Sequence, residues 1–164
     1  MSKKIFILLI LITLFLACPP VEQNTQTVSN PLEKFNGKWK SKNSSPPYDD
    51  WFELKIDDET FFYYNNGDPT NDLGYAGKIV SFDLSGDIYF LNLKITNRGS
   101  WDLTTDWYAR IYLQKTNSTI VKQAIGATGT YPNIIMVKPT LGEAKQTFTI
   151  ENNAYQYLGE YIAK

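Results

Sequence analysis

The chain has 164 residues, 16 of them basic and 17 acidic, with a single cysteine and no histidine. This length fits one domain with one core, and the near-neutral charge argues against a nucleic-acid-binding protein, which would need a basic surface. Because His-assisted catalysis, Cys/His zinc sites and internal disulfides all need residues that are missing, we predict no enzyme, no metal and no cofactor.

The first 17 residues have the pattern of a secretory signal. Lys3 and Lys4 precede an apolar run at 5–17, which is interrupted only by Thr13. The run is shorter than the ~20 residues that a transmembrane helix needs, and it has the length of a signal-peptide core. We therefore predict that residues 1–17 are removed from the mature protein.

The run ends in Phe15-Leu16-Ala17-Cys18, which resembles the lipobox of bacterial lipoproteins and, in its large first residues, the relaxed lipoboxes of spirochaetes. The resemblance implies cleavage before Cys18 and acyl chains on its thiol and new amine. Two or three such chains anchor a protein stably to a membrane. No Asp follows Cys18, which favours the outer membrane, on its periplasmic or surface face. An ordinary secretory signal with a free Cys18 is the alternative.

Residues 18–31 are mostly polar and contain three prolines. A segment with so little to bury does not compensate its ordering entropy, so we predict a flexible tether that begins at the lipidated cysteine. The folded domain is then expected to span residues 32–164.

The domain shows the side-chain alternation and the turn signals of antiparallel β-structure. Tyr89, Leu91, Leu93 and Ile95 share one face of a strand, for example, and Ser85-Gly86 before them is a hairpin signal. Short connections favour pairing between neighbours in sequence. The predicted strands are 36–41, 51–56, 60–64, 78–84, 87–95, 107–115, 119–127 and 155–163.

One short helix is predicted before the last strand. Thr140 and Glu143 form a capping-box pattern, and Leu141, Ala144 and Phe148 follow at helical spacing. The β-rich stretch after residue 146 is a competing signal. With about eight strands and many aromatic residues, we expect an all-β fold, an antiparallel up-and-down barrel in which closure removes exposed edges. A β-sandwich is the alternative.

Two motifs resemble those of lipocalins. Gly37-Lys38-Trp39 is similar to the Gly-x-Trp motif of their first strand, and Thr105-Asp106-Trp107-Tyr108 is similar to their Thr-Asp-Tyr motif. The resemblance covers residues 32–164. It implies a barrel in which Gly37 and Trp39 close one end, with a nearby arginine stacked on the indole. The strand sequences also resemble those of small spirochaetal lipoproteins.

Aromatic side chains are the candidate ligand-binding residues, because small-molecule sites are mostly apolar with a few polar groups. Arg110 could clamp a carboxylate or phosphate. If Trp107, Ala109, Ile111 and Leu113 face inward, however, Arg110 faces outward and is expected at the surface. The candidate site residues are Phe62, Tyr64, Tyr89, Tyr108, Arg110 and Tyr112.

Two functions follow from this sequence. The first is a membrane-anchored envelope lipoprotein whose barrel binds a small lipophilic molecule, which predicts a cavity of at least about 300 Å³. The alternative is a non-catalytic interaction lipoprotein with a filled core, which predicts an exposed aromatic patch that contacts envelope or host components. Nothing in the sequence determines the oligomeric state.

Overall fold

The computed structural model describes residues 29–43, 50–65 and 73–164. The chain divides into two units, Met1–Asn30 and Pro31–Lys164, and all elements below belong to the second. The predicted signal, Cys18 and nearly all of the predicted tether lie outside the described residues. Within the described ranges, no helix is both long and apolar enough to cross a membrane.

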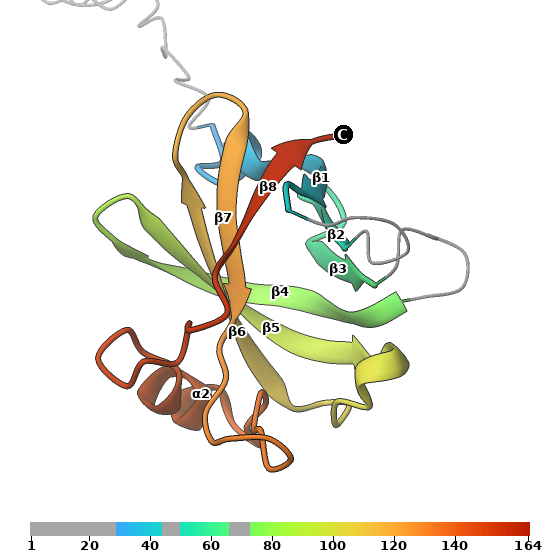
Figure 1. Ribbon diagram of the computed structural model, residues 1–164, viewed down its shortest axis with the longest axis vertical. Helices are drawn as coiled ribbons and strands as arrows, with labels where there is room; N and C mark the ends of the chain where they lie inside the picture. Colours follow the sequence, from blue (N-terminus) through green and yellow to red (C-terminus); the bar gives the residue numbers. More distant parts are fainter. Residues whose placement is uncertain (1–28, 44–49, 66–72) are drawn as a thin grey trace, which may run out of the picture. The chain divides into compact units, whose positions relative to one another are not determined.

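Eight antiparallel strands close into a lipocalin-like barrel (Figure 1). Each strand pairs with its neighbours in sequence, and β1 also pairs with β8, where Trp39 lies opposite Ala163. Closure leaves no free sheet edge, so the predicted barrel is confirmed over the sandwich. The strands are β1 (Gly37–Ser41), β2 (Trp51–Lys55), β3 (Thr60–Tyr64), β4 (Leu73–Ser85), β5 (Ile88–Asn97), β6 (Tyr108–Lys115), β7 (Ile120–Ile125) and β8 (Gly159–Ala163).

Tight turns join the strands at one end of the barrel, which we call the closed end. Gly86 takes a left-handed φ of 61° between β4 and β5, and the Asn117 side chain accepts hydrogen bonds from the backbone of Thr119 and Ile120 between β6 and β7. The short 3₁₀ helix η1 (Glu33–Phe35) precedes β1 at this end. The longer connections lie at the opposite end, the open end. One of them contains the 3₁₀ helix η2 (Gly99–Trp101).

The barrel interior is filled by the inward-facing residues that alternation predicted. Tyr89, Leu91, Leu93 and Ile95 of β5 are all buried in the main core, as are Ala109, Ile111 and Leu113 of β6. The expectation that Trp107 shares this face is wrong. The backbone turns at Asp106, which has a φ of 65°, and Trp107 stays 37% exposed ahead of β6.

The predicted helix is α2 (Leu141–Thr147), where the Thr140 hydroxyl accepts a hydrogen bond from the Glu143 backbone at 3.2 Å. It lies on the outside of the barrel (Figure 1), where Ala144 and Phe148 are buried in a second apolar cluster. The last strand begins at Gly159, four residues later than predicted, because Ala154 and Tyr155 pack into this outer cluster instead of joining the sheet.

Candidate functional site

The closed end of the barrel is sealed by aromatic packing. Trp39 is 4% exposed, donates its indole N–H to the carbonyl of Phe35 at 2.8 Å, and stacks on Phe52. Gly37, with a φ of 107°, makes the bend between η1 and β1. Lys115 lies over the Trp39 ring, 6.0 Å from its centroid, and donates to the backbone of Lys34. A lysine thus occupies the stacking position for which the lipocalin resemblance implied an arginine.

A continuous series of aromatic rings runs from this plug toward the open end. Phe52 contacts Phe61 at 5.5 Å between centroids, Phe61 contacts Tyr75 at 6.0 Å, and Tyr75 contacts Tyr63 at 5.4 Å. Trp101 of η2 completes the series, 4.9 Å from Tyr63. The rings change from phenyl to phenol along this path, so the interior becomes more polar toward the open end.

A cavity of about 450 Å³ lies at the open end. This volume falls within the range of small-molecule sites, and the lining has their usual composition of apolar and aromatic side chains with a few polar groups. The lining comes from β1, β3, β4, β7 and β8, with three residues from β7, and from the connections after β1, β5 and β7. The lining residues are Ser41, Asp50, Tyr63, Tyr75, Trp101, Gln123, Ala124, Ile125, Ala127, Ile134, Met136, Tyr157, Gly159 and Tyr161.

Tyrosine hydroxyls are the main polar groups of the cavity. Tyr63 donates to the Asp50 carboxylate at 3.1 Å. Tyr75 is fully buried, and its hydroxyl has no partner in good hydrogen-bonding geometry, although the Gln123 side chain lies close enough to lower its pKa. Burial, followed by the neighbouring Tyr161, raises the pKa of Tyr63 and Tyr75 well above the ordinary tyrosine value. Burial also raises the pKa of Tyr161 to about 12, so all three hydroxyls stay protonated at neutral pH.

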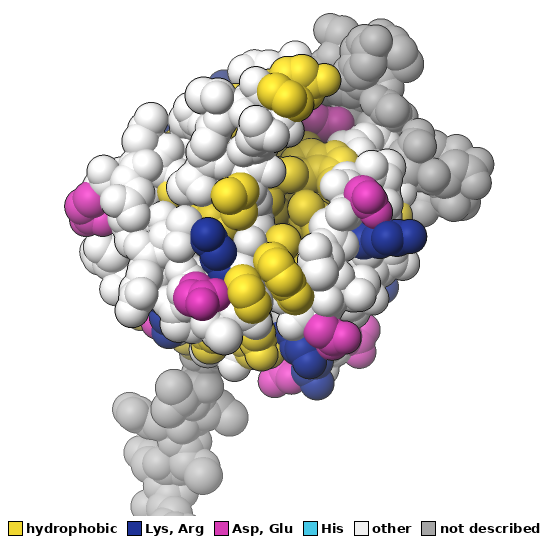
Figure 2. Space-filling view, turned by 90° about the horizontal axis from the view of Figure 1, so that it is seen from below, with side chains coloured by type: hydrophobic (Ala, Val, Ile, Leu, Met, Phe, Trp, Pro, Cys, Tyr) yellow, Lys and Arg dark blue, Asp and Glu magenta, His cyan; other side chains and the backbone are white. Residues whose placement is uncertain are grey.

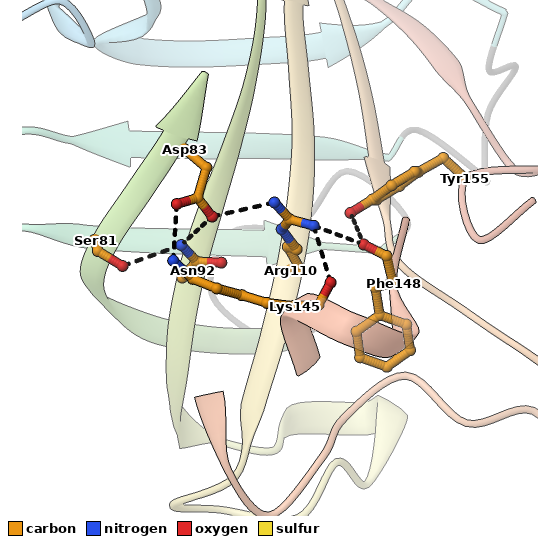
Figure 3. Close-up of polar contacts among 7 residues, drawn as sticks. All are labelled: Ser81, Asp83, Asn92, Arg110, Lys145, Phe148 and Tyr155. Atoms are coloured by element: carbon orange, nitrogen blue, oxygen red, sulfur yellow. Dashed lines mark hydrogen bonds and ion pairs between the residues drawn. The ribbon is translucent and has the colours of Figure 1, made fainter. Parts of the chain in front are cut away.

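A second polar cluster lies on the outer face of the barrel, beneath α2 (Figure 3). Arg110 of β6 donates to the Asp83 carboxylate at 3.1 Å and to the Phe148 carbonyl at 3.0 Å. Its guanidinium also lies over the Phe90 ring, 4.4 Å from the centroid. Tyr155 donates to the same Phe148 carbonyl at 2.9 Å. Arg110 therefore fastens the segment after α2 to the barrel wall.

Asp83 is the acceptor at the centre of this cluster (Figure 3). It pairs with Lys145 of α2 at 2.7 Å and accepts from Asn92, which also donates to Ser81. Burial alone would raise the pKa of Asp83. The hydrogen bonds from Lys145 and Asn92, together with the charges of Lys145 and Arg110, outweigh burial and hold this pKa below its usual value. The cluster is a structural clamp in which the Asp83 carboxylate is paired with two cations of the chain.

The structure separates the predicted site residues into three places, and none of them lines the cavity. Tyr89 lies in the interior toward the closed end, 5.2 Å from the Phe35 ring. Phe62 and Tyr64 lie on the outer face of β3, where Tyr64 stacks on Trp51 at 3.9 Å. Tyr108, Arg110 and Tyr112 lie together on the outer face of β6, near α2.

Arg110 faces outward, as predicted, but its expected position at the surface is wrong. Only 9% of the residue is exposed, because α2 and the segment that follows it cover this part of β6. Two of its nitrogen atoms donate to oxygens of the chain itself. Arg110 therefore holds α2 against the barrel wall.

The sequence analysis did not identify the residues that line the cavity, although the strand patterns bear on two of them, Tyr63 and Gln123. Tyr63 lies on the inward face of β3 with Phe61, but residues 60–64 are aromatic on both faces, so alternation does not fix their phase. Gln123 shares an inward face with Val121 and Ile125, and a polar residue on such a face marks a polar interior. Asp50 and Trp101 lie in connections, where no local pattern identifies them.

In the part of the chain that the structure describes, no group of three or more His, Cys, Asp and Glu residues is placed to hold a metal ion.

A search of known folds connects this barrel to a spirochaete protein. The crystal structure of Tp0751 (pallilysin) from Treponema pallidum superposes with a TM-score of 0.50, covers 83% of each chain, and is 5% identical in sequence. No protein-family model matches the chain, and no curated protein is significantly similar to it. At this identity the likeness concerns the fold alone: the chain has the barrel architecture of that spirochaete protein.

Proposed function

We propose that this chain is a non-catalytic envelope lipoprotein, anchored in the outer membrane through acyl chains on Cys18, whose barrel binds a small lipophilic molecule. The cavity at the open end carries the binding part of the proposal. It has a volume of about 450 Å³ and an aromatic lining, whereas the closed end of the same barrel is packed with side chains.

The buried hydroxyl of Tyr75 adds to this support. An unpaired buried polar group is unfavourable in the empty barrel, and a ligand with a hydrogen-bonding group would satisfy it. The cavity therefore fits a molecule that is mostly apolar but carries at least one polar group. The anchor rests on the sequence Phe15-Leu16-Ala17-Cys18, and the absence of histidine in the chain supports a non-catalytic role.

Binding is tested by fluorescence titration of the full chain with N-phenyl-1-naphthylamine, a neutral fluorophore that brightens in apolar sites. We expect saturable binding that is weakened by Tyr63→Trp, which enlarges a ring in the lining. Native mass spectrometry of the chain purified from its source would then identify a bound molecule. No saturable binding of the fluorophore and a mass without adduct would contradict the proposal.

The anchor is tested separately by metabolic labelling with radioactive palmitate. We expect the wild-type chain to carry label and to fractionate with outer membranes, and Cys18→Ser to lose both properties. Label that persists in Cys18→Ser would contradict lipidation at this residue.

A second candidate function is contact with an envelope or host component through the surface. The observation that favours it is a group of exposed hydrophobic side chains in the segment between β7 and β8, where Tyr131 is 88% and Tyr157 61% exposed. Figure 2, which views the side of the molecule where α2 lies, shows hydrophobic side chains gathered around a hollow. Loss of partner binding on Tyr131→Ser, with fluorophore binding unchanged, would favour this function.

A further inference from the structure

The described residues that line the cavity carry a negative charge and no positive one. Asp50 contributes a carboxylate, and no lysine or arginine is among the lining residues. Within the described ranges, no basic side chain forms an ion pair with Asp50. The clamp on the outer face offers a contrast, because there the Asp83 carboxylate is matched by both Arg110 and Lys145. Among the described residues, the Asp50 carboxylate in the cavity therefore has no cationic partner.

Aromatic rings surround this carboxylate. Tyr63, whose hydroxyl binds Asp50, is in ring contact with both Tyr75 and Trp101, and Trp101 lies 5.3 Å from Tyr75. The faces of such rings attract cations, and the attraction is stronger where water is excluded. The carboxylate and the aromatic rings therefore both favour a positively charged ligand group.

The neutral polar groups are also compatible with a cation. The Tyr75 hydroxyl, buried and without a hydrogen-bond partner, has lone pairs that can accept a hydrogen bond from an ammonium N–H. Ile125, Ile134 and Met136 supply apolar surface on other parts of the lining. An anionic ligand would instead place its charge near Asp50 without any basic side chain to compensate, which is unfavourable at a partly buried site.

From these observations we infer that the cavity selects a small organic cation, an amine with an apolar body, over neutral and anionic molecules of the same shape. The inference rests on the proposed binding function and names its ligand class. In the complex, the ammonium group lies between the Asp50 carboxylate and the rings of Tyr63 and Trp101, and the apolar body extends toward Met136.

The test compares three probes that share one body: 4-phenylbutylamine, 4-phenyl-1-butanol and 4-phenylbutanoate. Each is titrated against the full chain loaded with N-phenyl-1-naphthylamine, and its affinity is taken from displacement of the fluorophore. We expect the amine to bind about tenfold more tightly than the alcohol, the usual scale for a partly buried ion pair with cation–π contacts, and the carboxylate to bind most weakly. Equal affinities, or tightest binding of the carboxylate, would overturn the inference.

Asp50→Asn isolates the charge, because asparagine keeps an acceptor for the Tyr63 hydroxyl. We expect this variant to lose the advantage of the amine and to bind the alcohol as the wild type does. Asp58→Asn is the matched control, since it removes the same charge from an exposed turn at the closed end. An amine advantage that survives in Asp50→Asn would overturn the assignment of Asp50.

The two proposals fail differently. If the fluorophore binds and the three probes do not differ, the cavity is a binding site without charge selectivity. If the fluorophore does not bind at all, the binding function itself is contradicted. The comparison of probes on the wild-type chain does not depend on any variant folding.

Discussion

The two ends of the barrel are built from the same strands but filled in opposite ways. At the closed end, Trp39 and Phe35 are buried, and the one polar atom of the indole donates to a backbone carbonyl. At the open end, Tyr63, Tyr75 and Tyr161 surround a cavity, and the Tyr75 hydroxyl lacks a partner. Interiors normally pair their buried polar groups.

This contrast separates residues that stabilise the fold from residues that are available to a ligand. Along β3, Phe61 packs into the filled half of the barrel, and Tyr63, two residues further on, faces the cavity. Neighbouring inward-facing residues of one strand thus serve different purposes, Phe61 in the packed core and Tyr63 in the cavity lining. Substitutions at the two ends are therefore expected to affect different measurements.

The largest effect is expected for Trp39→Ala at the closed end. Removal of a buried indole leaves a cavity and typically costs 3–5 kcal/mol, so we expect the free energy of unfolding to fall by about 4 kcal/mol. Urea unfolding followed by circular dichroism measures this change. Because Trp39 does not line the cavity, the affinity for N-phenyl-1-naphthylamine in folded protein should stay unchanged. An affinity loss as large as that of a lining variant would show that the ends are not independent.

Arg110→Met is expected to have the next largest effect, since it breaks the clamp that holds α2. Loss of one partner from a buried pair is strongly destabilising, but Asp83 is one-third exposed and keeps Lys145, so we expect a loss of about 2 kcal/mol. The matched control is Arg98→Met, whose pair with Asp102 is exposed and should contribute less than about 0.5 kcal/mol.

Hydrogen exchange distinguishes a local effect of Arg110→Met from a global one. We expect faster exchange at the amides of α2 and of residues 148–155, with the amides of β2 and β3 less affected. A uniform increase over the whole barrel would contradict the role of Arg110 as a clamp for this segment.

The sequence predicted the barrel better than the cavity, for physical reasons. Inward-facing and outward-facing side chains alternate strictly over residues 87–95, so the sequence alone predicts which of them face the core. The stretch 73–77 contains Gly74 and Gly77, whose missing side chains give no alternation, and β4 begins five residues earlier than predicted. The cavity is harder still, because it joins single residues such as Asp50 and Gln123 from distant elements. Only closure of the barrel brings them together.

The tyrosines of the open end predict a specific response to alkaline pH. Burial raises the pKa of Tyr161 from 10.0 to about 12, so the folded state keeps a proton that the unfolded state releases. Stability is therefore fully present below pH 10 and is lost as pH rises toward 12, by up to about 1.4 kcal/mol per pH unit. In urea unfolding at pH 8 and pH 11, Tyr161→Phe should lose about 1 kcal/mol less than the wild type. Equal losses in both proteins would contradict this role.

The smallest effect on stability is expected for Tyr75→Phe, which is also the sharpest test of the difference between the closed and open ends. The substitution removes a buried hydroxyl that has no partner, so we expect stability to stay unchanged or to rise by up to about 1 kcal/mol. Tyr155→Phe is the matched control on the outer face. There the hydroxyl donates to the Phe148 carbonyl, and its removal should cost about 1 kcal/mol.

The two variants should also differ in binding. Tyr75→Phe removes a hydroxyl of the cavity lining and should lower the affinity for 4-phenylbutylamine. Tyr155→Phe should leave this affinity unchanged, because Tyr155 lies outside the cavity. A loss of stability in Tyr75→Phe equal to that in Tyr155→Phe would mean that the Tyr75 hydroxyl is already satisfied in the free protein. In that case the open end would be a completed interior like the closed end, and the main reason for expecting a polar ligand group there would be gone.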